Sequence, residues 1–128
     1  MTPRLSSKIF ALLILVVVAF ELALALGAPW GRVAMGGGVA GALPPRLRLA
    51  ALAQIVVLGL SALVILHRVG WALPFLRISH RWPAWIVVGL FAVAVVLNTI
   101  TPSGWERAIW LPVALGLFLT ALHVARSN

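Results

Sequence analysis

The sequence predicts an all-α membrane protein, a bundle of four transmembrane helices with both termini on the cytoplasmic side. Composition is the first indication: 63% of the 128 residues are hydrophobic and 9% are charged, against roughly 45–50% and about 25% in ordinary soluble domains. The second indication is that four stretches are long and apolar enough to cross a bilayer, which takes about 20 residues in a helix. Backbone amides in lipid must be satisfied internally, which favours helices.

The first span is expected at Ile9–Ala28, after the basic start MTPRLSSK. A cleaved signal peptide is the alternative, because Ala23-Leu24-Ala25 resembles a small-residue cleavage site. The apolar run nevertheless continues to a length that crosses a membrane, which favours a retained helix. The remaining spans are expected at Leu47–Leu66, Ala84–Ile100 and Glu106–Ala125, so residues 1–128 form a single integral membrane domain.

The connections between the spans carry two further signals. The first connection, GAPWGRVAMGGGVAGALPPR, is rich in glycine. An exposed flexible loop is expected there, and a re-entrant segment lining a cavity is the alternative. Before the fourth span, Ser103 and Glu106 have the S-x-x-E spacing of a capping box. The Ser103 hydroxyl should accept a hydrogen bond from the Glu106 amide, and the Glu106 carboxylate should accept one from the Ser103 amide. Both residues are therefore expected to have a structural role.

The fourth span contains a proline that predicts a kink. Pro112 removes a backbone donor inside the helix. Pro112, Gly116 and Thr120 recur at every fourth position and share one face. Small residues at this spacing favour close packing against another helix. A ligand groove beside the kink is the alternative.

Lysine and arginine set the orientation expected of the bundle. If both termini lie on one side, that side carries six of these residues and the other side four. The two sets are Arg4, Lys8, Arg68, Arg77, Arg81 and Arg126 against Arg32, Arg46, Arg48 and Arg107. Cytoplasmic loops are enriched in basic residues, so this count favours cytoplasmic termini.

The sequence also argues against several activities. The net charge is +8, but the basic residues are scattered, whereas a nucleic-acid-binding protein gathers them on one face. There is no cysteine, and His67, His80 and His123 form no His-x-x-x-His pair and lack an acidic partner. No metal and no cofactor is therefore expected. No serine lies in a nucleophile-elbow context, so the chain is not expected to be an enzyme.

Polar side chains from three spans are expected at a similar depth in the membrane. At a rise of about 1.5 Å per residue, Glu21 lies roughly 10 Å below the outer end of its span, and Gln54 lies at about the same depth. Asn98 ends the third span on that side, and Arg107 begins the fourth. Ionisable groups inside a membrane usually face the bundle interior and mark a site. These four residues are the candidates for binding a ligand or an ion.

The charge of Glu21 needs an explanation at such a depth. It is expected either to be suppressed by burial or to be compensated by Arg107 or Arg48. The alternative is that the polar groups only hold the helices together through hydrogen bonds.

Three segments, FELALALGAPWG (20–31), GALPPRLR (41–48) and NTITPSGWER (98–107), carry a resemblance in order and spacing. The chain resembles small four-span bacterial integral membrane proteins, a group without an assigned activity. This resemblance implies a multi-pass protein of the bacterial inner membrane. In architecture alone, the chain is also similar to small multidrug-resistance transporters, which have four short spans and a glutamate in the first. That likeness implies a cation- or proton-binding role for Glu21.

Two functions follow as hypotheses. The first is a non-enzymatic membrane protein that binds a lipid, a hydrophobic ligand or a partner membrane subunit through an inward polar cluster around Glu21. Its expected partners are membrane lipids and either another membrane protein or a second copy of the chain, with no nucleic acid. The second is a small proton- or cation-coupled transporter that uses Glu21. Whether Glu21 faces a cavity or a dry helix contact distinguishes the two.

Overall fold

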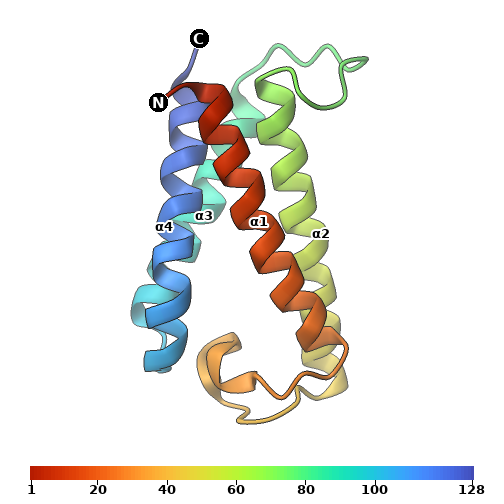
Figure 1. Cartoon of the computed structure of the whole chain (residues 1–128), viewed down its shortest axis with the longest axis vertical. Coiled ribbons are helices and arrows are strands. Elements are labelled where there is room, and N and C mark those ends of the chain that lie inside the picture. The colour runs from red at the N-terminus through yellow and green to blue at the C-terminus, as the bar shows by residue number, and fades with distance from the viewer.

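The computed structural model covers residues 1–128 and consists of four long α-helices without a strand (Figure 1). The expected all-α four-helix fold is confirmed, and each helix is long and apolar enough to cross a membrane. The helices are α1 (Pro3–Ala25), α2 (Pro45–Arg68), α3 (Trp82–Ile100) and α4 (Gly104–Arg126), and two short 3₁₀ turns, η1 (Gly31–Val33) and η2 (Met35–Gly37), lie between α1 and α2.

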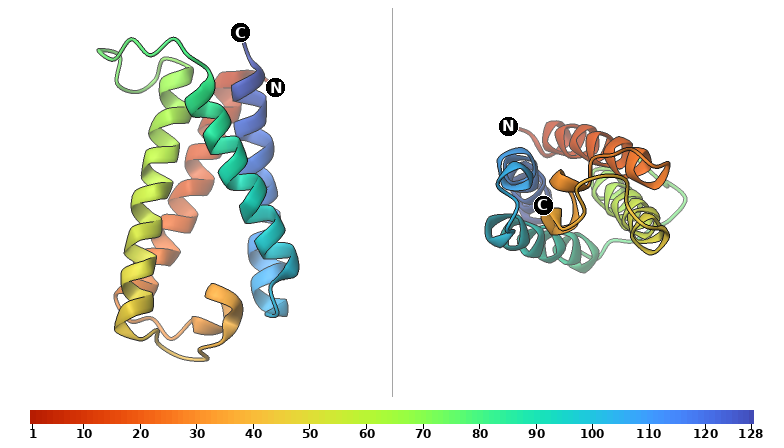
Figure 2. Two further views of the ribbon diagram at one scale, coloured as in Figure 1. Left: turned by 180° about the vertical axis from the view of Figure 1, so that it is seen from behind. Right: turned by 90° about the horizontal axis from the view of Figure 1, so that it is seen from below.

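The four helices run alternately up and down the long axis of the molecule (Figure 1). Helix α1 packs against α2 and α4, and α3 packs chiefly against α4. Helix α2 lies loosely against α3 and separates from it toward one end of the bundle (Figure 2). We call that end, which holds connection 26–44 and turn 101–103, the loop end. The opposite end holds both termini and connection 69–81 and is called the terminal end.

Helix α1 differs most from its expected bounds. It begins at Pro3, well before Ile9, because the Thr2 hydroxyl accepts the amide of Leu5 over 3.1 Å and proline suits the first turn. It ends at Ala25 instead of Ala28, so the expected end was too late. The chain there turns through Gly27, whose φ is 104°, a conformation that glycine adopts without strain.

The hydrogen bonds at this end form a Schellman motif. The amide of Ala28 donates to the carbonyl of Ala23 over 2.9 Å, and the amide of Gly27 donates to Leu24 over 3.1 Å. The other three helices contain their expected spans and extend slightly beyond them.

Two apolar clusters hold the bundle together. The larger one joins all four helices, with the ring of Phe10 packed edge-on against Phe91 at a centroid distance of 5.4 Å. The smaller one lies toward the loop end and contains Leu24, Ala34 and Leu43. Large apolar side chains remain exposed on all four helices. Such an outer surface suits a hydrocarbon environment, because soluble proteins rarely expose continuous apolar patches of this extent.

Polar contacts join three of the helices at the terminal end. The Ser6 hydroxyl and His123 Nδ1 lie 2.6 Å apart, and Ser6 is fully buried. The guanidinium of Arg68 donates to the carbonyl of Ser127 over 2.8 Å. Hydrogen bonds of this kind between helices in a membrane contribute about 0.6–2 kcal/mol each. The first contact joins α1 to α4, and the second joins the end of α2 to the residue after α4.

Helix α4 is continuous through Pro112. The packing face expected in this helix lies against α1 at Gly116, where a side-chain carbon would come within 2.9 Å of the Leu13 side chain. Thr120 is buried one turn later and donates to the carbonyl of Gly116 over 2.7 Å. These contacts are consistent with a packing role for the small residues.

Candidate ligand-binding cavity

The glycine-rich connection folds back against the helix bundle. The expectation of an exposed loop was therefore wrong, because Gly31, Ala34 and Leu43 are buried. We call residues 31–37, which form η1 and η2, the plug segment. Seen from the loop end, it lies across the space between the helices (Figure 2, right).

Three hydrogen bonds attach the plug segment to α4 and the residue before it. The Ser103 hydroxyl donates to the carbonyl of Arg32 over 2.5 Å, and the Trp110 indole donates to the carbonyl of Val33 over 2.8 Å. The amide of Gly36 donates to Glu106 Oε2 over 3.0 Å. The bonds to Gly36 and Val33 are part-buried and satisfy backbone groups that no helix pairs, which explains why the connection can pack here.

Glycine makes the tight path of the plug segment possible. A side-chain carbon at Gly31 would lie 1.9 Å from the carbonyl oxygen of Val39, so only glycine fits there. Gly36 and Gly37 have φ values of 84° and 73°. Met35 also takes a positive φ, of 49°, which a non-glycine residue adopts less readily.

Half of the expected capping box is present. The Ser103 hydroxyl accepts the Glu106 amide over 3.1 Å and caps α4. The Glu106 carboxylate does not reach back to the Ser103 amide, as had been expected. Its Oε2 instead accepts the Thr101 hydroxyl over 2.6 Å and the Gly36 amide over 3.0 Å. The plug segment supplies a donor that the sequence spacing alone does not reveal.

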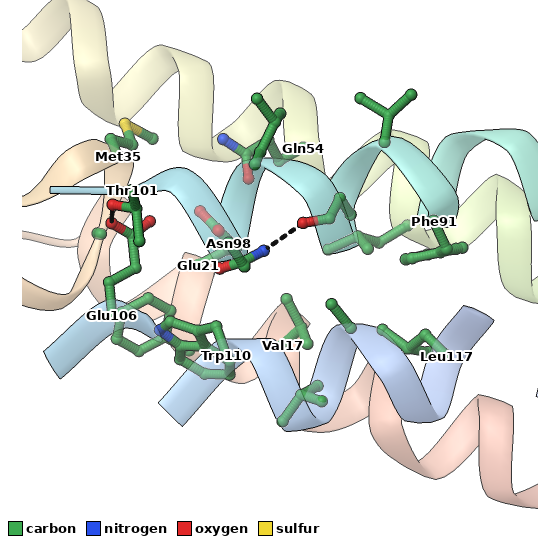
Figure 3. A pocket seen from close by; sticks show the side chains of 18 of the residues that line it. Val17, Glu21, Met35, Gln54, Phe91, Asn98, Thr101, Glu106, Trp110 and Leu117 are labelled. Atoms are coloured by element: carbon green, nitrogen blue, oxygen red, sulfur yellow. Dashed lines mark hydrogen bonds between the residues drawn. The ribbon is translucent and has the colours of Figure 1, made fainter. Parts of the chain in front are cut away.

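Next to the plug segment lies a cavity of about 810 Å³. All four helices and the plug segment contribute to its wall, and 18 of its 25 lining residues are hydrophobic (Figure 3). On the side of α2 and α3 the lining residues are partly exposed, Val57 and Leu97 among them. The cavity therefore opens sideways between the two helices that separate toward the loop end.

Three of the four candidate residues meet at this cavity. Glu21 from α1, Gln54 from α2 and Asn98 from α3 all line it (Figure 3). The amide of Asn98 donates to the carbonyl of Ala94 in its own helix, over 2.8 Å. Glu21 is buried, Asn98 is half-buried and Gln54 is exposed. No hydrogen bond joins Glu21 to Gln54 or Asn98, so the three residues share the cavity wall without forming a connected polar cluster.

Glu21 is the most buried of these polar groups. Its side chain is 7% exposed, and its Oε2 is buried without a hydrogen-bond partner. A buried polar oxygen without a partner has lost its hydration without a compensating hydrogen bond, which is unfavourable. Unsatisfied buried groups are rare in native proteins and often accompany a functional role.

Of the two alternatives for the charge of Glu21, compensation by an arginine is not found. Arg107 is exposed and donates to the carbonyl of Thr101 over 2.7 Å, and Arg48 donates to the carbonyl of Leu43 over 2.8 Å. Neither residue lines the cavity. Both guanidinium groups are engaged by backbone carbonyls at the loop end, where the chain turns and carbonyls lack helical partners. Arg107 is therefore not part of this site.

Sequence reasoning missed two members of the cavity wall. Glu106 had been assigned a capping role, yet it lines the cavity, and so does Trp110. The two residues lie four positions apart and therefore share one helix face, which is the signal that was available in the sequence. For the plug segment, the glycine-rich sequence indicated a re-entrant segment lining a cavity only as the alternative to an exposed loop.

No protein-family model, no curated protein and no solved structure matches this chain. The resemblance to small four-span bacterial membrane proteins therefore rests on the sequence pattern and stays an expectation. The cavity and its side chains are the basis for assigning a function.

Proposed function

We propose that this protein is a non-enzymatic, multi-pass protein of the bacterial inner membrane that binds a lipid or another hydrophobic molecule in the cavity around Glu21. The observation that carries the proposal is the cavity itself, which is largely apolar and has a few polar groups at one end. Sites for small molecules have this character and typically enclose about 300–1,000 Å³. The cavity volume of about 810 Å³ lies within that range.

The position of the opening supports a ligand that comes from the bilayer. Val57 and Leu97 border the gap between α2 and α3 and present apolar surface. A hydrocarbon chain entering between these helices would meet apolar side chains first. Glu21 lies deeper and is largely buried. An amphipathic molecule would thus place its polar head near Glu21 and its hydrocarbon part toward α2 and α3.

Native mass spectrometry of the full-length protein, purified from bacterial membranes in mild detergent, tests the proposal. The wild-type protein should retain a bound hydrophobic molecule of defined mass. Ala53 on α2 lines the cavity, so Ala53→Trp should fill part of it and reduce the retained molecule. Leu52 is exposed on the same helix and does not line the cavity, so Leu52→Trp is the matched control.

Three results would count against this function. One is that no molecule is retained, and another is that Ala53→Trp and Leu52→Trp retain it equally well. The third is a defined complex with a protein subunit whose binding both variants leave intact. That complex would favour a partner-binding role on another surface.

Proton- or cation-coupled transport is a second candidate function. The observation that favours it is that Glu21 faces a cavity and that its Oε2 has no partner, since intramembrane carboxylates of this kind serve as ion or proton carriers. Proteoliposomes with a pH-sensitive dye inside provide the test. Under an imposed membrane potential, the wild-type protein should carry protons and Glu21→Gln should not. A flux equal to that of protein-free vesicles would exclude proton carriage.

A further inference from the structure

We propose that the ligand in this cavity carries a cationic head group, either a protonated amine or a quaternary ammonium, on a hydrophobic body. The inference rests on the proposed function, because it names the chemistry of the molecule that would occupy the same cavity. Three observations carry it: the distribution of acidic and basic residues in the chain, the free carboxylate oxygens and the aromatic rings in the same cavity.

Charge is sharply divided between this cavity and the rest of the molecule. The chain has ten Lys and Arg residues, three His residues and two acidic residues. Both acidic residues, Glu21 and Glu106, line the cavity, and none of the Lys, Arg or His residues does. The cavity therefore gathers both acidic side chains of a strongly basic chain and none of its basic side chains. An anionic ligand would meet carboxylates there without a basic partner, which disfavours its binding.

Both carboxylates retain the capacity to accept hydrogen bonds. Oε2 of Glu21 has no partner, and the side chain is more than nine-tenths buried. Glu106 receives the bonds from Thr101 and Gly36 on Oε2 alone, so Oε1 stays free of them. A carboxylate buried in an apolar wall is stabilised best by an opposite charge that also donates hydrogen bonds. A protonated amine supplies both, and a quaternary ammonium supplies the charge.

Two aromatic rings line the same cavity as the carboxylates. Phe20 precedes Glu21, and Trp110 follows Glu106 by one helical turn; both rings line the cavity. Their centroids lie 4.5 Å apart at an angle of 51°. The bond from the indole of Trp110 to the carbonyl of Val33 holds that ring in place. Phe20 is also stacked on Trp30 at a centroid distance of 6.0 Å. Aromatic rings that line a cavity attract organic cations, and quaternary ammonium groups in particular.

A comparison of three probes with the same dodecyl chain tests the inference. The probes are dodecyltrimethylammonium, which is cationic, dodecanol, which is neutral, and dodecanoate, which is anionic. Each is added to the full-length protein in nanodiscs of zwitterionic phospholipid, and the bound probe is counted by native mass spectrometry. We expect the cation to bind at least about tenfold more tightly than dodecanol, and dodecanoate to bind most weakly.

Variants assign this preference to the cavity. Glu21→Gln should remove most of the preference for the cation while the affinity for dodecanol stays unchanged. Glu21→Asp keeps the charge and should keep the preference, which separates the effect of charge from an effect on folding. Ala53→Trp should weaken all three probes, because it reduces the space that they share.

The outcomes separate this inference from the proposed function. If Ala53→Trp weakens all probes but the cation has no advantage, the inference is overturned and the cavity still binds hydrophobic molecules. The inference is likewise overturned if Glu21→Gln weakens the cation and dodecanol equally. If Ala53→Trp leaves all probes unaffected, the cavity is not the binding site and both proposals are overturned.

Discussion

The carboxylate of Glu106 accepts the backbone amide of Gly36 over 3.0 Å, a bond between residues seventy positions apart in the chain. It joins the start of α4 to the plug segment, and the same carboxylate faces the cavity. A hydrogen bond to an ionised acceptor contributes about 1.5–3 kcal/mol. The position of the plug segment is therefore coupled to whatever contacts Glu106 inside the cavity.

Glu106→Ala should loosen the plug segment. The substitution removes the acceptor of the Gly36 amide, so hydrogen–deuterium exchange at that amide should rise by about tenfold or more, the ratio that corresponds to about 1.4 kcal/mol. Mass spectrometry of the peptide covering 31–37 measures it. Glu106→Gln keeps an oxygen acceptor and should have a smaller effect. Thr99→Ala is the control, because the Thr99 hydroxyl bonds only the carbonyl of Val95 in its own helix. Unchanged exchange in Glu106→Ala would contradict the bond.

Ser103→Ala should destabilise the protein more than the loss of an ordinary helix cap. A cap contributes about 1 kcal/mol, and the Ser103 hydroxyl also donates to the carbonyl of Arg32. We expect a loss of about 1.5–2.5 kcal/mol in reversible unfolding in mixed micelles. The matched variant is Thr2→Ala, because Thr2 caps α1 through one bond to Leu5. Equal losses in the two variants would show that the contact with Arg32 contributes nothing.

Gly31→Ala should disrupt the packing of the plug segment. A side-chain carbon at this position would lie 1.9 Å from the carbonyl oxygen of Val39, so the backbone has to move. Overpacking of this kind costs about 1–3 kcal/mol. Gly41→Ala is the control, because a side-chain carbon at Gly41 meets no atom within 4 Å. Thermal unfolding of the two variants should differ clearly, and similar melting temperatures would argue against the tight turn.

The terminal end is expected to face the cytoplasm. Six of the ten basic residues lie on that side by the count from the sequence, and such residues favour the cytoplasmic side. The chain has no cysteine, so single cysteines can report the topology. Ala40 and Asn128 are exposed at opposite ends. A membrane-impermeant maleimide should label Ala40→Cys in intact cells and Asn128→Cys only after permeabilisation. The reverse pattern would invert the orientation and leave the fold unchanged.

Composition and spacing were sufficient to predict the four helices and the similar height of three polar residues along the bundle. Hydrophobic stretches of membrane-spanning length leave little choice of secondary structure, because only helices satisfy their own backbone in lipid. A regular rise per residue then places Glu21 and Gln54 at a similar height, with Asn98 near them. All three line the same cavity. The Ser103 cap was also predictable, since it depends on residues three positions apart.

The long-range contacts of the loop end needed the folded structure. The sequence predicts Arg107 close to the depth of Glu21. In the structure, however, the guanidinium of Arg107 donates to the carbonyl of Thr101, and Oε2 of Glu21 has no partner. A glycine-rich sequence by itself indicates a flexible loop. In the structure, however, the amide of Gly36 donates a hydrogen bond to the carboxylate of Glu106. Local patterns follow from the periodicity of a helix, but the partner of a buried polar group depends on which segments meet in space. The cavity exists because α2 and α3 separate and the plug segment folds against α4, and no spacing within one segment encodes that meeting.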